Sequence, residues 1–351
     1  ERFKETGKIF FLPLHKNTVN PSGILQDGKF FVGKIRNGFM DERHCLWIGV
    51  GKIRGKVDKP DFFQLQTSPE GFRNIFSQIA FDEGKRVGPR FVPMTIGNIA
   101  AAQIAIAHGI HGPSLTLNTA CSAGGDAIMT ATMLLHSGEA DAVLAVGGES
   151  ILCPIVVSGL AQAKALSRRN DDPEHACRPF DADRDGFVIG EGGGALLIET
   201  EEHAVKRGAT IYARLAGWAN TSDAHHVTAP CPDGEGAARC MKLALAGMQP
   251  SDIGYINAHG TSTPLGDKAE TFAVKSVFGG RECAPPMSST KSATGHLMGA
   301  GGLTEVIACI MAVREGVLPP TLHLDTPDPD CDLDYVPNAA RKADISAAMS
   351  N

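Results

Sequence analysis

Three short stretches of the sequence place reactive side chains among glycines and other small residues. In the first, NTACSAGG at residues 118–125, Cys121 stands between two apolar runs, the second of them helical in character. A helix that begins directly after a cysteine presents unpaired N–H groups and partial positive charge. Both favour the thiolate, and the same N–H groups can hold a developing oxyanion. The pattern predicts a nucleophile at a sharp strand-to-helix turn. The alternative is a buried structural cysteine, the commoner role in an apolar run.

The second stretch, AHGTSTPLGDKAE at residues 258–270, carries a histidine and a hydroxyl-rich loop. His259 follows a short apolar run, so its imidazole can reach a substrate carbonyl from the end of a strand. The hydroxyls of Thr261 and Thr263 are suited to hydrogen-bonding a polar ligand. The alternative is a structural one: a histidine in a turn, followed by threonines that cap the next helix, explains the same residues equally well.

The third stretch, SSTKSATGHLMGAGG at residues 288–302, contains Lys291 and His296 at a further strand-to-helix junction. Zinc is a weak alternative for Cys121, His259 and His296, because they lack short ligand spacing and a fourth partner. The GEGGGA run at 190–195 mimics a dinucleotide fingerprint but leads into a strand-like run instead of a helix, so it is discounted.

Helical and strand-like runs alternate from about residue 86 onward. Each reactive residue follows a predicted strand, which is where α/β sheets bind ligands. The order of runs between 114 and 146 implies a parallel pair covered on both faces. We predict helices near 95–107, 123–136, 268–278 and 297–314, strands at 114–119, 142–146, 186–199, 254–260 and 285–290, and a polar surface excursion at 167–185. Residues 1–85 indicate no architecture.

Two of the predicted helices resemble one another. AGG opens each of them, at 123–125 and at 300–302, and each stays nearly free of charge for about three turns before a glycine ends it. One interpretation is that two buried helices share a composition. The other is a duplicated α/β unit whose two central helices pack back to back.

Composition narrows the classes of function. Lys and Arg number 33 and Asp and Glu 39, a net charge of −6, which argues against nucleic acid or an anionic membrane surface as the main partner. Residues 91–125 carry no charge but are interrupted by glycine, proline and polar residues, so a buried helix and strand are expected there instead of a membrane span. The first 20 residues lack the pattern of a secretory signal. Nine widely spaced cysteines favour a reducing compartment over a disulfide framework.

Taken together, the three stretches and the run ALSRRNDDPEHACRPFDADRDGFVIGEGGGALLIE at 165–199 resemble the elongating β-ketoacyl-[acyl carrier protein] synthases of type II fatty acid synthesis, members of the thiolase superfamily. The resemblance covers residues 86–350. It implies a five-layered α-β-α-β-α fold with two halves related by a pseudo-twofold axis. The first half, 1–215, would carry the nucleophile and the second, 216–351, the two histidines. This family normally continues with a Ser-Phe-Gly-Phe-Gly-Gly-Thr-Asn segment where the printed sequence ends.

The resemblance also implies roles for individual residues. Cys121 would accept an acyl chain from acyl carrier protein, and His259 and His296 would hold the malonyl thioester and stabilise the enolate left by decarboxylation. Lys291 would polarise the site, with Glu270 as the carboxylate behind it. Thr261 and Thr263 would hold the phosphopantetheine arm.

No metal or other cofactor is implied, and a cytoplasmic or organelle-matrix homodimer is expected, without nucleic acid or membrane partners. A polyketide-type ketosynthase and a catalytically silent chain-length partner subunit remain the alternatives; such subunits usually lack the cysteine. A biosynthetic thiolase fits less well, because its second cysteine is not found.

Overall fold

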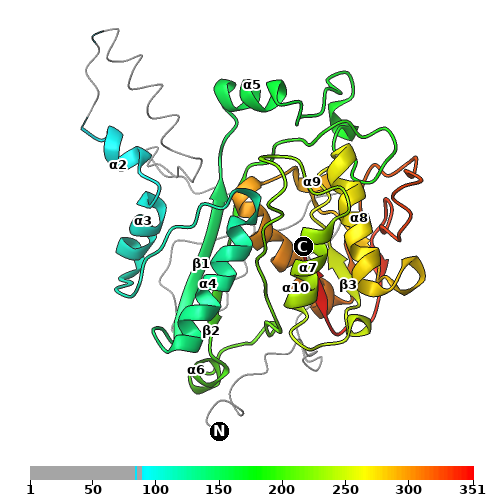
Figure 1. Ribbon diagram of the computed structural model, residues 1–351. Coiled ribbons are helices and arrows are strands. Elements are labelled where there is room, and N and C mark those ends of the chain that lie inside the picture. Colours follow the sequence, from blue (N-terminus) through cyan, green and yellow to red (C-terminus); the bar gives the residue numbers. More distant parts are fainter. Residues whose placement is uncertain (1–83, 85–88) are drawn as a thin grey trace.

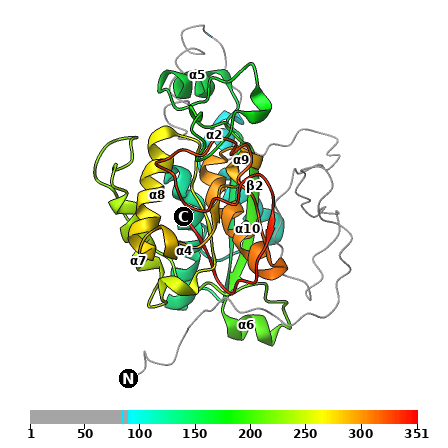
Figure 2. The ribbon, with the colours of Figure 1, turned by 90° about the vertical axis from the view of Figure 1, so that its right-hand side faces the viewer.

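The computed structural model describes residue 84 and residues 89–351, in which helices and strands alternate (Figure 1). Residues 1–83, for which no architecture is predicted, lie outside the described residues. Figures 1 and 2 show α4 (Ala123–Ser137) and α10 (Gly301–Glu315) side by side in the middle of the molecule. None of the helices in the described part is long and apolar enough to cross a membrane.

The first half of the described chain contains two corrections to the predicted elements. The helix predicted over 95–107 begins later, as α3 (Ile99–His108), because Ile96 is extended and residues 96–98 turn; a separate short helix, α2 (Phe91–Thr95), precedes it. The segment 114–119 is not a strand. Its side chains are mostly exposed, and no described strand pairs with it. A strand-like sequence pattern is therefore not sufficient to form a strand here.

The strands that do pair in this half are β1 (Ala142–Glu149) and β2 (Gly192–Glu199). They are antiparallel, with Ala142 opposite Glu199 and Glu149 opposite Gly192, so the expected parallel pair of 114–119 and 142–146 is wrong. Gly147, Gly193 and their glycine neighbours let the backbones and α10 approach closely. A Cβ on Gly147 would lie 2.7 Å from Leu303 Cδ1. Helix α5 (Pro154–Gln162) and helix α6 (Glu201–Lys206) lie at opposite ends of the molecule (Figure 1).

The second half is built on a three-stranded parallel sheet in the order β4–β3–β7. Ile256 of β3 pairs with Met287 of β4 and Met349 of β7, and these strands lie in the largest apolar cluster together with Phe180. The predicted strands at 254–260 and 285–290 and the helices at 268–278 and 297–314 are confirmed in position. The elements are α7 (Glu235–Ala244), β3 (Tyr255–Asn257), α8 (Pro264–Phe278), β4 (Met287–Ser288), α9 (Lys291–Thr294), α10, β5 (Val317–Leu318), β6 (Arg341–Lys342) and β7 (Ala348–Ser350).

Helices α4 and α10 have the same construction and pack against one another at their starts. Each follows a 3₁₀ turn, Ala120–Ser122 and Met298–Ala300, whose first residue is left-handed (φ 52° and 45°). Each ends at a left-handed glycine. A Cβ on Gly124 would lie 2.6 Å from the Leu303 nitrogen, so only glycine permits this approach. The predicted back-to-back packing of the two helices is confirmed.

The polar run at 167–185 is only in part the surface excursion that its composition predicts. Residues 167–175 are mostly exposed, whereas the second part is buried, because its charges are paired with one another and with the second half of the chain. Arg178 Nε donates to Asp181 at 2.9 Å, and Arg184 contacts Asp328 at 2.8 Å and Asp267 at 3.1 Å. Buried charges are tolerated only when they are paired in this way. The segment therefore joins the two halves.

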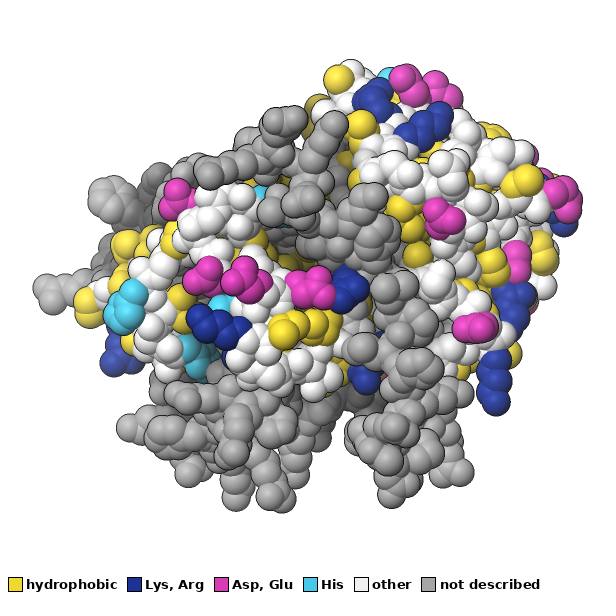
Figure 3. All heavy atoms as spheres, turned by 90° about the horizontal axis from the view of Figure 1, so that it is seen from below, with side chains coloured by type: hydrophobic (Ala, Val, Ile, Leu, Met, Phe, Trp, Pro, Cys, Tyr) yellow, Lys and Arg dark blue, Asp and Glu magenta, His cyan; other side chains and the backbone are white. Residues whose placement is uncertain are grey.

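Opposite charges are interspersed on the face of the molecule seen from below (Figure 3). Near α6, Glu199 pairs with Arg207 and Glu201 with Arg214. Neighbouring opposite charges cancel much of each other's field, so the described residues of this face show no large area of one sign.

Candidate active site

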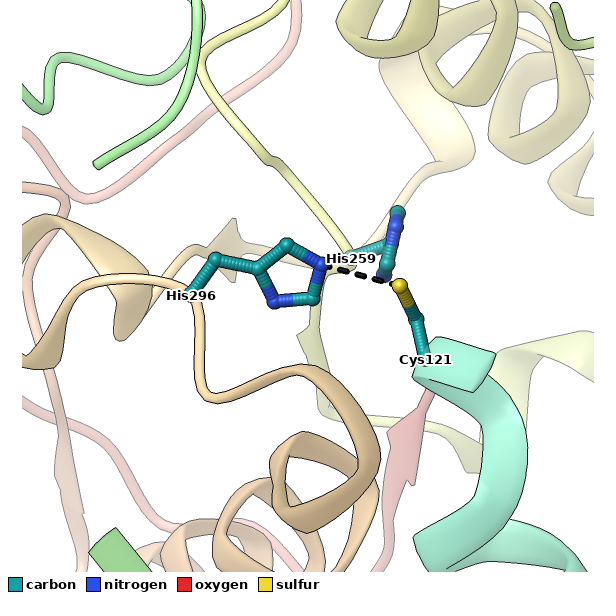
Figure 4. Close-up of side chains that lie close together, drawn as sticks. All are labelled: Cys121, His259 and His296. Atoms are coloured by element: carbon teal, nitrogen blue, oxygen red, sulfur yellow. Dashed lines mark hydrogen bonds between the residues drawn. The ribbon is translucent and has the colours of Figure 1, made fainter. Parts of the chain in front are cut away.

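Cys121 lies in the sharp 3₁₀ turn that leads into α4. Ala120, immediately before it, is left-handed, and the chain reverses there so that the thiol points away from the helix (Figure 4). Small residues follow at 122–125 because α10 crosses the start of α4 at backbone distance. The turn therefore presents a half-buried cysteine beside a helix N-terminus, although the segment 114–119 before it is not the strand that the sequence pattern predicts.

His296 faces this sulfur directly. Its Nε2 lies 3.0 Å from Cys121 Sγ, and Figure 4 shows the ring directed at the thiol. The backbone N–H of Met298 donates to the other ring nitrogen, Nδ1, at 3.3 Å. A neutral imidazole that accepts at Nδ1 carries its proton at Nε2. The Met298 amide therefore selects the tautomer that donates an N–H to the thiolate.

His259, just beyond the end of β3, completes the cluster. Its ring meets that of His296 edge to face, with 5.5 Å between the centroids. One donor atom from each of Cys121, His259 and His296 lies within 4.8 Å of the other two. Residues far apart in the sequence thus converge on one point, which the three separate motifs could only suggest.

The electrostatics of the cluster are set by burial. Burial, with the nearby Lys291 charge, lowers the pKa of His296 to about 3 and that of His259 well below its ordinary value. Both rings are therefore neutral at physiological pH. Burial raises the pKa of Cys121, and Lys291 opposes this shift only in part. The stabilisation of the thiolate expected from the helix N-terminus is thus outweighed by desolvation.

Lys291 begins α9 and is almost completely buried beside Glu305 of α10, with which it forms an ion pair. The sequence-based interpretation placed Glu270 behind this lysine, whereas the structure places Glu305 there. Glu305 was missed, although it is the only charged residue between 297 and 313. A single carboxylate in an otherwise apolar helix was the signal that could have identified it.

Glu270 has a different task. One of its oxygens accepts the backbone N–H of His259 and the other that of Gly260, both at 2.7 Å. The carboxylate of Glu270 thereby fixes the backbone that carries the His259 ring. Asn351 Nδ2 also donates to it, at 2.6 Å.

Thr261 and Thr263 occupy the loop between His259 and α8. Their hydroxyl oxygens lie 2.9 Å apart, one donating to the other. Thr261 is buried and Thr263 is half-buried. The two hydroxyls form a small polar pair next to His259, at the entrance to α8.

The three-residue cluster also has the donor types of a zinc site, the alternative considered from the sequence. The separation of 3.0 Å between Sγ and Nε2 is that of a hydrogen bond, and the cluster contains no fourth ligand among the described residues. Zinc would need Nε2 of His296 free of its proton, whereas the Met298 N–H occupies Nδ1 and leaves the proton on Nε2. The residues present do not fit a closed zinc site.

Comparison with known proteins places this geometry in a family. Residues 71–204 match the β-ketoacyl synthase N-terminal domain, and residues 212–325 match the C-terminal domain. The chain is 46% identical over 312 residues to 3-oxoacyl-[acyl-carrier-protein] synthase 2 of Staphylococcus aureus, covering 88% of this chain and 74% of that protein. The chain belongs to the β-ketoacyl synthase family.

Other β-ketoacyl synthases agree with this assignment. The chain is 49% identical to 3-oxoacyl-[acyl-carrier-protein] synthase 2 of Synechocystis and 50% to that of Rhizobium meliloti, over 78% and 77% of this chain. It spans 66% and 65% of the lengths of these two relatives. The motif-based prediction of the family is confirmed.

Solved structures support the fold. A type II polyketide ketosynthase, in complex with its acyl carrier protein and bound to a hexaketide, superposes with a TM-score of 0.75 at 37% identity, covering 80% of this chain and 71% of that one. A β-ketoacyl synthase from Burkholderia phymatum gives a TM-score of 0.74 at 36% identity, over 82% of this chain and 69% of that one. The predicted α/β, thiolase-like fold is confirmed.

Proposed function

We propose that this β-ketoacyl synthase is a condensing enzyme that elongates fatty acyl chains. It would transfer an acyl group to Cys121 and join that group to a malonyl thioester with loss of carbon dioxide. The observation that supports this most strongly is the convergence of Cys121, His259 and His296 at the starts of α4 and α10. The names of the curated relatives point to the same reaction.

In the first step, the thiolate of Cys121 attacks the carbonyl of the incoming thioester. The bond from this carbonyl to the carrier's sulfur breaks, and the carrier leaves as a thiolate, which takes up the proton that the Cys121 thiol released. Because burial raises the pKa of Cys121, the proton on Nε2 of His296 is important here: its hydrogen bond stabilises the small thiolate fraction.

In the second step, the malonyl thioester loses carbon dioxide and leaves an enolate. Two neutral imidazoles can each donate an N–H to the enolate oxygen, and the low pKa values of His259 and His296 keep both rings in that form. The enolate carbon then attacks the acyl carbonyl, the bond to Cys121 sulfur breaks, and a 3-oxoacyl product leaves. One such donor contributes about 3 kcal/mol to the lowering of a barrier.

The remaining predicted site residues support this pair of steps. Burial lowers the pKa of both histidines, and the charge of Lys291, held by Glu305, lowers them further. Glu270 fixes the backbone of His259. Thr261 and Thr263 would bind the polar part of the phosphopantetheine arm of the substrate.

The partner that delivers both substrates would be acyl carrier protein, which the related polyketide ketosynthase binds. A homodimer is supported by Ile106, Ile110 and Leu115, which are large apolar side chains exposed on one stretch of the first half. The eight cysteines of the described residues are free, in keeping with a cytoplasmic protein. The match to the N-terminal domain ends at residue 204 and that to the C-terminal domain begins at residue 212, so a division close to the predicted residue 215 is part of the proposal.

Acyl transfer from acyl carrier protein, followed by intact-protein mass spectrometry, tests the proposal. We expect the protein to gain one acyl mass, located at Cys121 by peptide mapping, and Cys121→Ala to gain none. Cys283→Ala, at an exposed cysteine of the same chain, is the matched control and should acylate like the wild type. Uptake by Cys121→Ala would show that the nucleophile is misassigned.

A polyketide-type ketosynthase is the second candidate, because a polyketide ketosynthase is among the similar structures. The two differ in whether the 3-oxoacyl product serves as the next primer. A fatty acid enzyme should elongate a saturated acyl primer well and a 3-oxoacyl primer poorly, whereas the polyketide type should accept both. A silent chain-length subunit would elongate neither primer.

A further inference from the structure

Glu149, the last residue of β1, is a buried carboxylate that neither half-reaction uses. Its Oε2 accepts the backbone N–H of Gly299 at 3.2 Å. Gly299 lies in the 3₁₀ turn Met298–Ala300, three residues after His296 and directly after Met298. The carboxylate thus holds the turn whose Met298 amide selects the tautomer of His296.

The same carboxylate stands next to the turn that carries Cys121. Gly299, in the turn Met298–Ala300, packs close to the turn Ala120–Ser122 and to Glu149. A Cβ added there would lie 3.3 Å from Glu149 Oε2 and 3.7 Å from both the Ala120 carbonyl oxygen and the Ala123 Cβ. Besides burial, the charge of Glu149 contributes to the raised pKa of Cys121, so there is an electrostatic interaction between the carboxylate and the thiol. Glu149 therefore lies where the two turns meet.

We propose that Glu149 is a positioning residue that sets the distance between Cys121 and His296 through its hydrogen bond to the Gly299 amide. This inference deepens the proposed function and rests on it for its consequence in catalysis. Holding a donor to within a fraction of an ångström matters because a misplacement of about 1 Å can cost about 100-fold in rate. The rigid end of β1, paired with β2 at Gly192, is a suitable anchor for such a contact.

The chemistry of the carboxyl group indicates that its acceptor oxygen, and not its charge, performs this task. Oε1 is buried and has no hydrogen-bond partner among the residues that the structure describes, which is costly for a charged oxygen and less so for a neutral acid. Burial, with a smaller contribution from Glu191, raises the pKa of Glu149 to about 7. In either protonation state Oε2 remains free to accept from Gly299. A glutamine should therefore replace Glu149 well, and an aspartate, shorter by one methylene, should not.

The test measures alkylation of Cys121 by iodoacetamide at pH 7, followed by peptide mass spectrometry, with exposed Cys283 as the internal reference. Wild type is compared with Glu149→Ala, Glu149→Gln, Glu149→Asp, His296→Ala and the double variant Glu149→Ala/His296→Ala. Loss of the Nε2 donor should slow alkylation in His296→Ala by about tenfold. We expect Glu149→Ala and Glu149→Asp to be slowed to a similar degree and Glu149→Gln to stay within about threefold of the wild type.

The double variant decides whether Glu149 acts through His296. If it does, Glu149→Ala/His296→Ala alkylates no more slowly than His296→Ala alone. A further slowing on that background, a wild-type rate in Glu149→Ala, or a Glu149→Gln as slow as Glu149→Ala would each overturn the proposal. If Glu149→Ala fails to fold, Glu149→Asp takes its place in the same comparison.

Glu191→Gln is the matched control, because it removes a neighbouring charge and keeps the acceptor oxygen that binds Ser150 and Leu152. Its alkylation rate should equal that of the wild type. Alkylation requires neither acyl nor malonyl substrate, so the outcome stands independently of the proposed reaction. Failure of the proposed function would instead appear as normal alkylation without acyl uptake.

Discussion

Nε2 of His296 lies 3.0 Å from Sγ of Cys121, although 175 residues separate the two along the chain. Each is placed by the start of a buried helix, and the two helices are in backbone contact there. The thiol and the imidazole are thus positioned by two helix starts whose backbones are in contact.

Replacing His296 by alanine should separate the two half-reactions. We expect decarboxylation of malonyl thioester to fall by at least about 100-fold, because an enolate donor is lost. Acyl transfer to Cys121 should fall by about tenfold or less, since only thiolate stabilisation is removed. Release of labelled carbon dioxide and acyl uptake measure the two steps separately. Equal losses in both would contradict this division of roles.

A matched pair of glycines in the first turn of α4 tests the close packing. Gly124→Ala should lower the free energy of unfolding by about 1–3 kcal/mol, because its Cβ would lie 2.6 Å from the backbone nitrogen of Leu303, which cannot yield cheaply. The Cβ of Gly125→Ala would meet no atom of the described residues within 4 Å, so this variant should raise the free energy of unfolding by about 0.5–1 kcal/mol through helix propensity. Urea denaturation measures both.

If the two alanine variants were equally stable, the contact between α4 and α10 would be looser than the structure indicates. Acyl uptake should fall in Gly124→Ala and not in Gly125→Ala, because only the former displaces the start of α10.

The raised pKa of Glu149 makes stability depend on pH. The folded pKa is about 7, above the ordinary value of 4.5, so this group's favourable contribution is full below about pH 4.5 and is lost as the pH rises through 7. Glu149→Gln lacks that dependence. Between pH 5 and pH 8 its free energy of unfolding should rise relative to the wild type by up to about 3 kcal/mol. A constant difference between the two proteins across this range, in urea denaturation, would contradict the assignment.

The buried pair Lys291 and Glu305 should be far more sensitive to loss of one partner than of both. Glu305→Ala leaves the lysine ammonium buried without its counter-ion and should cost about 3–5 kcal/mol in stability. The double variant Lys291→Met/Glu305→Leu should be markedly more stable than Glu305→Ala, although inactive. Thermal unfolding of the three proteins checks this order. A double variant as unstable as the single one would mean that the pair itself is the source of stability.

Removal of metal ions should leave activity unchanged. The hydrogen bond from the Met298 amide keeps the proton of His296 on the nitrogen that faces sulfur, so the proposed steps use N–H donors. Condensation measured after dialysis against a strong chelator should equal that of untreated protein within error. Loss of activity, restored by zinc, would favour the metal alternative.

The sequence indicates which side chains lie together better than it indicates which strands pair. Residue type and the small residues around them singled out Cys121, His259 and His296, the resemblance to the family implied their roles, and the structure brings the three side chains together. Segment 114–119 was misassigned because the alternation of its side chains does not specify a neighbouring strand. The strand that pairs with β1 is β2, which begins 50 residues after the start of β1. Pairing over such distances depends on tertiary packing.

The misassigned carboxylates have a similar explanation. The resemblance to the family implied Glu270 as the carboxylate behind Lys291, yet Glu305 on α10 is the residue that folding brings to it. The polar run around Arg184 was expected at the surface because composition cannot reveal that Asp267 and Asp328 meet it inside.

The turns before α4 and α10 have the same backbone conformation but different side chains, and Cys121 in the first corresponds to Gly299 in the second. A Cβ at 299 would lie 3.3 Å from Glu149 Oε2, so a side chain there would crowd the buried carboxylate. The two related turns therefore offer one thiol and not two. In the proposed reaction the first turn would carry the covalently bound acyl group, and the second would position His296 for the substrate that is not bound covalently.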